Sequence, residues 1–247
     1  MSGHNKWSTI KRKKGAADAK RGQIFTKIAK EITLAAKGGG DPDSNPALRT
    51  AIDKAKAANM PKDNVEKALK KGTGELPGVV YEEYLYEGYA PKGIALMMMT
   101  ITDNKNRTTS EIRHILSKYG GNLGEDGCVA WNFDKKGQVF VKKESSDEDT
   151  VMDIIIEAGG EDLKTEDDGY YITCDYKDLF VVADAIKQKD IAVESAEIIY
   201  IAQNLVSIDE NNTKKVLRVL SLLDDLDDVA NIFSNLDIPD DMDLEEE

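Results

Sequence analysis

The residues whose types best suit a chemical task stand at the start of the chain, and they are cationic. His4, Lys6 and Trp7 lie close together, and the run Lys11-Arg12-Lys13-Lys14 follows. From Met1 to Gly74 there are 17 Lys or Arg residues against 7 Asp or Glu, a balance of +10, whereas the rest of the chain has a balance of −23. The net charge of −13 therefore describes a basic arm joined to an acidic body. Positive charge gathered in one segment attracts polyanions, so we expect the arm to bind nucleic acid.

The predicted contacts extend from the arm onto the helices that follow it. Lysine and arginine bind phosphates by releasing condensed counterions, which makes such binding steeply dependent on salt. Trp7 either stacks on a base or anchors the arm, and the alternative for the arm as a whole is a solvated basic end. The predicted nucleic-acid contacts are His4, Lys6, Trp7, Lys11, Arg12, Lys13, Lys14, Lys20, Arg21, Lys27, Lys54 and Lys56.

A polar loop from Thr102 to Thr108 follows a nearly continuous apolar run and opens a helix. Backbone N–H groups at a helix start can hold an anion, so Asn104, Lys105 and Arg107 form a candidate phosphate or partner site. The alternative is a well-capped turn, because Thr108 and Glu111 have the spacing of a capping box.

The sequence contains few residues or motifs that would suggest an enzyme. Its two histidines, His4 and His114, lack cysteines or carboxylates at zinc-binding spacing, and no nucleophile elbow or Walker motif is present. Cys128 and Cys174 lie in apolar segments without CxxC spacing, which indicates buried free thiols in a reducing compartment. We therefore predict no catalytic residue, no metal and no cofactor.

The first part of the chain, residues 1–78, is predicted to be the basic arm plus a small helical bundle. Apolar residues recur at helical spacing after Ala16, and Gly38-Gly39-Gly40 ends that helix. A second helix starts at Pro46, and a third, short one ends at Gly72.

The remainder is predicted to form two α+β domains, one inserted in the other. Residues 135–204 have the order βαββαβ of a ferredoxin-like domain, whereas residues 79–134 supply only part of such a domain. That part comprises strands, a helix and a further strand over Cys128 to Phe133. We expect residues 205–238 to complete it with a strand over Leu205 to Ile208, a helix, and a strand over Val229 to Leu236, although this last segment also fits a helix. The fold class is thus multi-domain α+β, with a three-helix domain, two ferredoxin-like domains and an acidic tail at 239–247.

Several motifs resemble those of one known family, the YebC/PmpR family, at similar spacing over nearly the whole chain. They are Gly3-His4-Asn5-Lys6-Trp7, residues 22–27, residues 39–42, residues 51–61, Tyr86-Glu87-Gly88-Tyr89, residues 102–108 and residues 120–124. The resemblance implies a probable transcriptional regulator, and a mitochondrial branch of the family acts as a translational activator.

Two functions follow as expectations. The first is a DNA-binding transcriptional regulator, and the second is a translation factor associated with ribosomal RNA or the ribosome. The cations are overwhelmingly lysine, which suits phosphate contact better than base reading and slightly favours the second. No apolar run approaches the roughly 20 residues that span a bilayer, and the basic N-terminus lacks a signal-peptide core. We therefore expect a cytoplasmic protein; its oligomeric state stays open, and a monomer fits the sequence.

Overall fold

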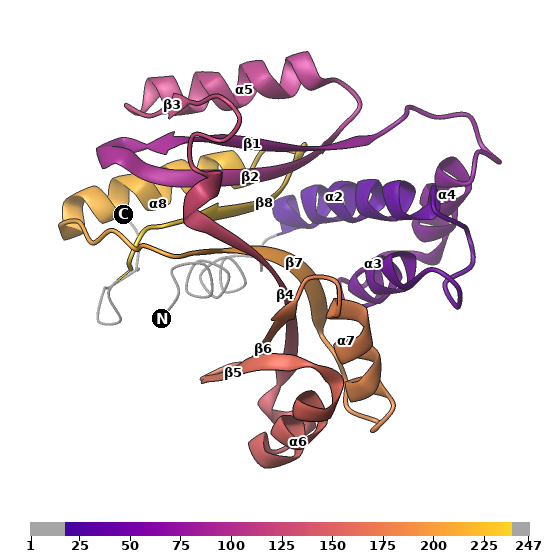
Figure 1. Cartoon of the computed structure of the whole chain (residues 1–247). Coiled ribbons are helices and arrows are strands. Elements are labelled where there is room, and N and C mark those ends of the chain that lie inside the picture. The colour runs from indigo at the N-terminus through magenta and orange to yellow at the C-terminus, as the bar shows by residue number, and fades with distance from the viewer. Residues whose placement is uncertain (1–17, 239–247) are drawn as a thin grey trace. The chain divides into compact units, whose positions relative to one another are not determined.

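The computed structural model describes residues 18–238 of the chain (Figure 1). These form two compact units. The first unit contains residues 18–30, 79–134 and 201–238 of the described chain, and the second contains residues 31–78 and 135–200. The predicted domain boundaries lie at 78/79, 134/135 and 204/205. Unlike the two compact units, they give the N-terminal helices a domain of their own, and that assignment remains a proposal.

Three helices occupy the N-terminal part, as predicted: α2 (Asp18–Ala36), α3 (Pro46–Ala57) and α4 (Lys62–Gly72). The Asn45 side chain caps α3 by accepting a hydrogen bond from the Leu48 backbone N–H at 3.1 Å. Gly72 ends α4 where a Cβ atom would lie 2.4 Å from the Thr33 carbonyl oxygen, so only glycine permits that approach.

The first unit holds a four-stranded antiparallel sheet in the order β3-β1-β2-β8. Its strands are β1 (Glu82–Ala90), β2 (Ile94–Thr102), β3 (Asn122–Leu123) and β8 (Val229–Ser234). Alternate residues of β2 pack in one core with Ile112 of α5 (Lys105–Lys118) and Val216 of α8 (Glu210–Asp224). The segment after Val229 is therefore a strand, as predicted, and it completes the sheet.

The second sheet confirms the predicted βαββαβ order. It comprises β4 (Phe133–Lys142), α6 (Glu148–Ala158), β5 (Gly160–Glu166), β6 (Gly169–Asp175), α7 (Leu179–Lys187) and β7 (Ser195–Ala202). The strand order is β5-β6-β4-β7, and its core includes Val139, Ile155, Ile172 and Val182.

The two sheets share the same spatial arrangement of strands and helices, and they differ only in where one strand occurs in the sequence. In sheet order, β3, β1, β2 and β8 correspond to β5, β6, β4 and β7. Helix α5 follows β2 as α6 follows β4, and α8 precedes β8 as α7 precedes β7. The difference is that β1 comes first in the chain, whereas its counterpart β6 comes third. The first sheet is thus a permuted version of the ferredoxin-like pattern.

The predicted strand over Cys128 to Phe133 is wrong. Residues Ala130–Asn132 form a 3-10 turn, and β4 begins at Phe133 and continues through Lys135-Lys136-Gly137. The buried Glu87 carboxylate accepts hydrogen bonds from the N–H groups of Gly127, Val129 and Ala130 at 2.7–2.8 Å, which removes these donors from any strand ladder. The predicted strand over Leu205 to Ile208 is likewise reduced to a single parallel bridge between Val206 and Leu236.

Candidate nucleic-acid interface

Most predicted arm contacts lie outside the described residues. These are His4, Lys6, Trp7, Lys11, Arg12, Lys13, Lys14 and the side chain of Lys20, and the predicted acidic tail at 239–247 also lies outside. The described candidates are Arg21, which is exposed in the first turns of α2, Lys27, Lys54, Lys56, and the loop with Asn104, Lys105 and Arg107.

Helix α2, which directly follows the arm, is fastened within the first unit by one stripe of side chains. Gln23, Lys27 and Lys30 are spaced by four and three residues and so lie on one helix face. Their partners lie in the acidic turn, which we define as residues 224–228. The Gln23 amide donates to the Asp225 carbonyl at 2.9 Å, and the Lys30 ammonium donates to the Asp227 carbonyl at 2.8 Å. Lys27 donates to the Asp224 carbonyl and lies 3.6 Å from its carboxylate.

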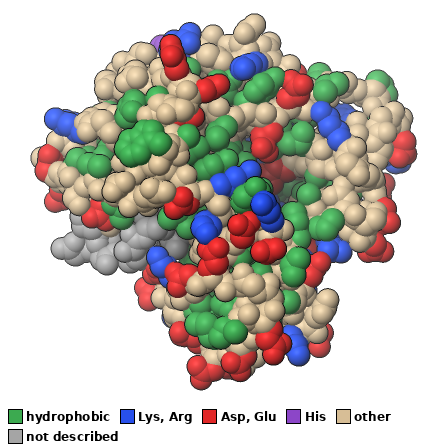
Figure 2. Space-filling view, viewed as in Figure 1, with side chains coloured by type: hydrophobic (Ala, Val, Ile, Leu, Met, Phe, Trp, Pro, Cys, Tyr) green, Lys and Arg blue, Asp and Glu red, His purple; other side chains and the backbone are tan. Residues whose placement is uncertain are grey.

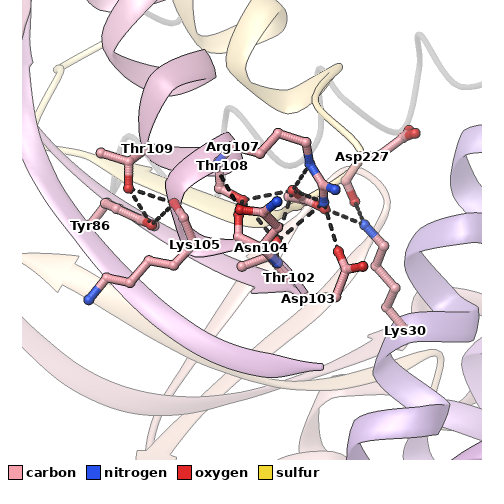
Figure 3. Close-up of polar contacts among 11 residues, drawn as sticks. Lys30, Tyr86, Thr102, Asp103, Asn104, Lys105, Arg107, Thr108, Thr109 and Asp227 are labelled. Atoms are coloured by element: carbon pink, nitrogen blue, oxygen red, sulfur yellow. Dashed lines mark hydrogen bonds and ion pairs between the residues drawn. The ribbon is translucent and has the colours of Figure 1, made fainter. Parts of the chain in front are cut away.

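Asp228 is the centre of the polar network around this stripe, and Figure 3 labels its donors Lys30, Thr102, Arg107 and Thr108. Its side chain is 3% exposed. One carboxylate oxygen accepts a hydrogen bond from Lys30 at 2.6 Å. The other accepts from Thr102 at 3.0 Å, Thr108 at 2.7 Å and Arg107 at 2.8 Å. Asp228 therefore joins α2 to the end of β2 and the first turn of α5.

The charge of Asp228 is stabilised by these donors. Burial alone would raise the pKa of this carboxyl group, but hydrogen bonds from Lys30, Arg107 and Thr108 outweigh burial and lower the pKa to about 2. The carboxylate therefore stays ionised and binds the two cations at all ordinary pH values.

The loop before α5 is a capped turn whose arginine already has anionic partners. Asn104 is the N-cap, and its side chain accepts from the Arg107 backbone N–H at 3.1 Å. The helix thus begins four residues earlier than the Thr108–Glu111 spacing predicted, because the Thr108 hydroxyl is directed to Asp228. Arg107 pairs with Asp228 at 2.8 Å and Asp103 at 2.9 Å, and these hydrogen bonds raise its pKa. The exposed Lys105 ammonium lies 4.6 Å from the centre of the Tyr84 ring.

The two predicted lysines of α3 differ in their surroundings. Within the second unit, Lys54 lies 3.0 Å from the Glu31 carboxylate and 3.1 Å from that of Glu197. Burial lowers the pKa of Lys54, but the two carboxylates more than compensate and the net shift is upward. The Lys56 side chain is 73% exposed and lies 3.1 Å from the Asp53 carboxylate. The charge of Lys54 is therefore balanced by carboxylates inside the fold, whereas the charge of Lys56 lies at the surface.

Within residues 18–238, no three His, Cys, Asp or Glu side chains gather in a group that could hold a metal ion. Both cysteines are free, and burial raises the pKa of Cys174 to about 11. No helix in the described part of the chain is long and apolar enough to cross a membrane.

Sequence reasoning did not identify Asp228, because Asp224-Asp225-Leu226-Asp227-Asp228 is typical of a solvated turn. The available signal was the stripe of Gln23, Lys27 and Lys30 on α2. A lysine that becomes buried on a helix face needs an anionic partner.

Comparison with known proteins places this arrangement in a family. The TACO1/YebC N-terminal domain matches residues 5–75, and the second and third domain of TACO1/YebC match residues 81–236. The chain belongs to the TACO1/YebC family. The resemblance found in the sequence motifs is therefore confirmed.

Relatives of this TACO1/YebC chain match it from end to end. A probable transcriptional regulatory protein of Desulfatibacillum aliphaticivorans is 57% identical over 98% of both chains, and one of Dictyoglomus turgidum is 50% identical over 98% of both. The crystal structure of a conserved hypothetical protein, Aq1575 from Aquifex aeolicus, is 42% identical, with a TM-score of 0.85 over 93% of this chain and 95% of that one. The names of the relatives support a regulatory role, and the crystal structure confirms the multi-domain α+β fold class.

Proposed function

We propose that this TACO1/YebC-family chain is a non-enzymatic regulator of transcription that binds DNA through its basic N-terminal arm. The observation that carries the proposal is the separation of charge, with a balance of +10 up to Gly74 and −23 beyond it. A segment of this kind binds the phosphate backbone, while the acidic remainder limits non-specific attachment elsewhere. The names of the curated relatives favour DNA as the target.

The ion pairs described above divide the lysines into those that hold the fold together and those that remain candidates for phosphate contact. Lys27 and Lys30 pair with the acidic turn, and Lys54 pairs with two carboxylates, so these lysines hold the helices in place. Phosphate contact then falls to the residues from His4 to Arg21, with Lys56 as an additional cation. The loop with Lys105 is a weaker candidate, because Arg107 already has two carboxylate partners.

A second candidate function is a cytoplasmic translation factor that binds RNA or the ribosome. The predominance of lysine over arginine in the arm favours it, because lysine acts as a point charge toward phosphate and does not offer a bidentate contact to bases.

The arm can be tested by changing Lys11, Arg12, Lys13 and Lys14 together to alanine. We expect weaker binding to duplex DNA and a plot of log affinity against log salt that is less steep by about 3 to 4, since each lost phosphate contact removes ~0.9. The matched control removes four exposed lysines of the second unit, Lys143, Lys164, Lys177 and Lys189. An unchanged slope in the arm variant would exclude the arm as the main contact.

The nature of the target is tested by comparison of a DNA duplex with structured RNA, and by sedimentation of cell extract. A regulator of transcription binds DNA and remains in the light fractions. Sedimentation with ribosomes at low salt and release at high salt would instead support the translation factor.

A further inference from the structure

Two helices of the first unit, α5 and α8, carry several cations, and of those on α5 only Arg107 takes part in the network around Asp228. Helix α5 contains Lys105, Arg107, Arg113 and Lys118 but only one acidic residue, Glu111. Its counterpart in the second sheet, α6, contains Glu148, Asp149, Asp153 and Glu157 and no lysine or arginine. Both helices pack on one face of a sheet at the same position in the same arrangement. The opposite charge of α5 is therefore a property of this surface and not of the architecture.

The negative charge of α6 is visible on the surface of the molecule. Figure 2 shows Asp and Glu side chains gathered over α6. The exposed positions of α5 are Lys105, Asn106, Arg107, Ser110, Arg113, His114, Ser117 and Lys118, and its one carboxylate, Glu111, is half-buried. In a segment whose balance is −23, a helix with four cations and one carboxylate is unusual.

Helix α8 extends the same cationic surface. It packs beside α5 over the same core, through Val216 and Leu220 against the residues that also contact Ile112 and Leu116. The Lys118 ammonium lies 5.6 Å, and the Arg218 guanidinium 5.9 Å, from the centre of the Tyr119 ring. Tyr119 therefore brings a cation from each helix to one place.

These cations are available to a ligand. Among the described residues, no carboxylate forms an ion pair with Arg113, Lys118, Lys215 or Arg218, and all four are exposed. Glu210 on α8 is paired with Lys214 at 2.8 Å, and Asp224 is engaged with Lys27. The acidic residues of α8 are thus already paired with lysines.

We propose that the outer surface of α5 and α8 is a second nucleic-acid contact, which binds the phosphate backbone of duplex DNA. This inference rests on the proposed function and extends it from the arm to the first unit. Neither helix presents an exposed Phe, Tyr or Trp for stacking on unpaired bases, which favours a duplex over a single strand. Phosphate contacts of this kind fix position without reading sequence, so the surface binds duplexes of any sequence.

The test uses the full-length chain and a variant with Arg113→Gln, Lys118→Gln and Arg218→Gln. Glutamine keeps most of the side-chain length and the packing over Tyr119, and circular dichroism with thermal unfolding checks the fold. At ~0.1 M salt we expect duplex affinity to fall about tenfold or more, and the salt slope to become less steep by ~2 to 3. The measurement is fluorescence anisotropy of a labelled random-sequence duplex over a salt series.

The control carries Lys143→Gln, Lys164→Gln and Lys189→Gln, three exposed lysines of the second unit, and gives the same change in net charge. The proposal stands if the α5/α8 variant loses affinity and slope while the control stays within about twofold of the unaltered protein. An unaltered slope in the α5/α8 variant, or an equal loss in both variants, overturns it.

The outcome separates this inference from the proposed function. If the unaltered protein binds the duplex but the α5/α8 variant binds equally well, only the second contact is refuted. If the unaltered protein does not bind the duplex at any salt concentration, both proposals fail. A loss that occurs with an RNA hairpin and not with DNA refutes the assignment of duplex DNA.

Discussion

Asp228 shows how a single carboxylate can determine the position of a helix that is distant in sequence. Its two oxygens receive donors from α2, from the end of β2 and from the first turn of α5. An isolated buried charge of this kind would be costly, and it is tolerated because Lys30, Arg107 and two hydroxyl groups compensate it. Lys30 of α2 is thus held in the first unit by an ion pair with a carboxylate distant in sequence.

Asp228→Asn should lower the free energy of unfolding at pH 7 by about 3 to 5 kcal/mol, because it leaves Lys30 buried without its carboxylate partner. Chemical denaturation of the variant and the unaltered protein measures the difference. Asp225→Asn is the matched control in the same turn, since Asp225 is exposed and only its backbone carbonyl holds Gln23. An effect of Asp228→Asn no larger than that of Asp225→Asn would contradict the role of the carboxylate.

The same difference should depend on pH with a definite sign. The pKa of Asp228 is depressed in the folded protein to about 2, from an ordinary value of 3.8. Its contribution is therefore fully present above pH 4 and decreases as the pH falls through the folded pKa. The stability gap between the unaltered protein and Asp228→Asn should narrow between about pH 4 and pH 2.

At the scale of single residues, the sequence could indicate the cations but not their partners. Lys27, Lys54 and Arg107 were predicted from charge and position, and each lies near carboxylates. Which lysine is paired depends on contacts between segments about 200 positions apart, such as Lys30 and Asp228. Local pattern carries no information about such contacts.

At the scale of elements, the segment after β3 shows why alternation alone is a weak guide to strands. Val129, Trp131 and Phe133 alternate as a strand would, yet the Trp131 side chain is 69% exposed and the segment contains a 3-10 turn. Glu87 on β1 determines the conformation by accepting three backbone N–H groups of this segment. Burial raises the pKa of Glu87, but the three N–H donors outweigh burial and lower it.

Glu87→Gln should destabilise the protein by about 2 to 3 kcal/mol, because the amide cannot accept all three hydrogen bonds and its own N–H groups face donors. Thermal unfolding measures the change, and hydrogen exchange should be faster at Gly127, Val129 and Ala130. Glu83→Gln on the same strand is exposed and should leave both measurements nearly unchanged. Equal effects of the two variants would contradict the role of Glu87.

The helices were predicted more reliably than the strands because their signals are local. Pro46 after Asn45 marked the start of α3, and glycines marked the ends of α2 and α4. The strand at Val229–Ser234 was recovered only by a topological argument, since the first sheet lacked a fourth strand. The start of α5 was misplaced because a buried hydrogen bond uses Thr108.

At the scale of the whole molecule, charge is separated twice. The basic arm stands apart from an acidic remainder, and within that remainder α5 differs in charge from its counterpart α6. The first separation is evident from composition. The second required the correspondence between the two sheets, which only the strand order reveals.

A chain that begins at Asp18 tests the division of roles between the arm and the remainder. Because the contacts of Gln23, Lys27 and Lys30 are retained, we expect thermal unfolding to change little, while affinity for nucleic acid falls sharply. Calorimetry and anisotropy on the same preparation measure the two properties. Undiminished affinity in the shortened chain would refute the proposed function.

The permuted order of the first sheet has a consequence for synthesis on the ribosome. Strand β2, which is almost entirely apolar, has β8 as one of its two neighbours, and 126 residues lie between Thr102 and Val229. At a synthesis rate of ~5 to 20 residues per second, that edge of β2 stays unpaired for roughly 6 to 25 s before β8 is made. The βαββαβ sheet can form earlier. The nascent chain therefore leaves the apolar strand β2 with an unpaired edge until β8 has been synthesised, and an unpaired edge of this kind can pair with other chains.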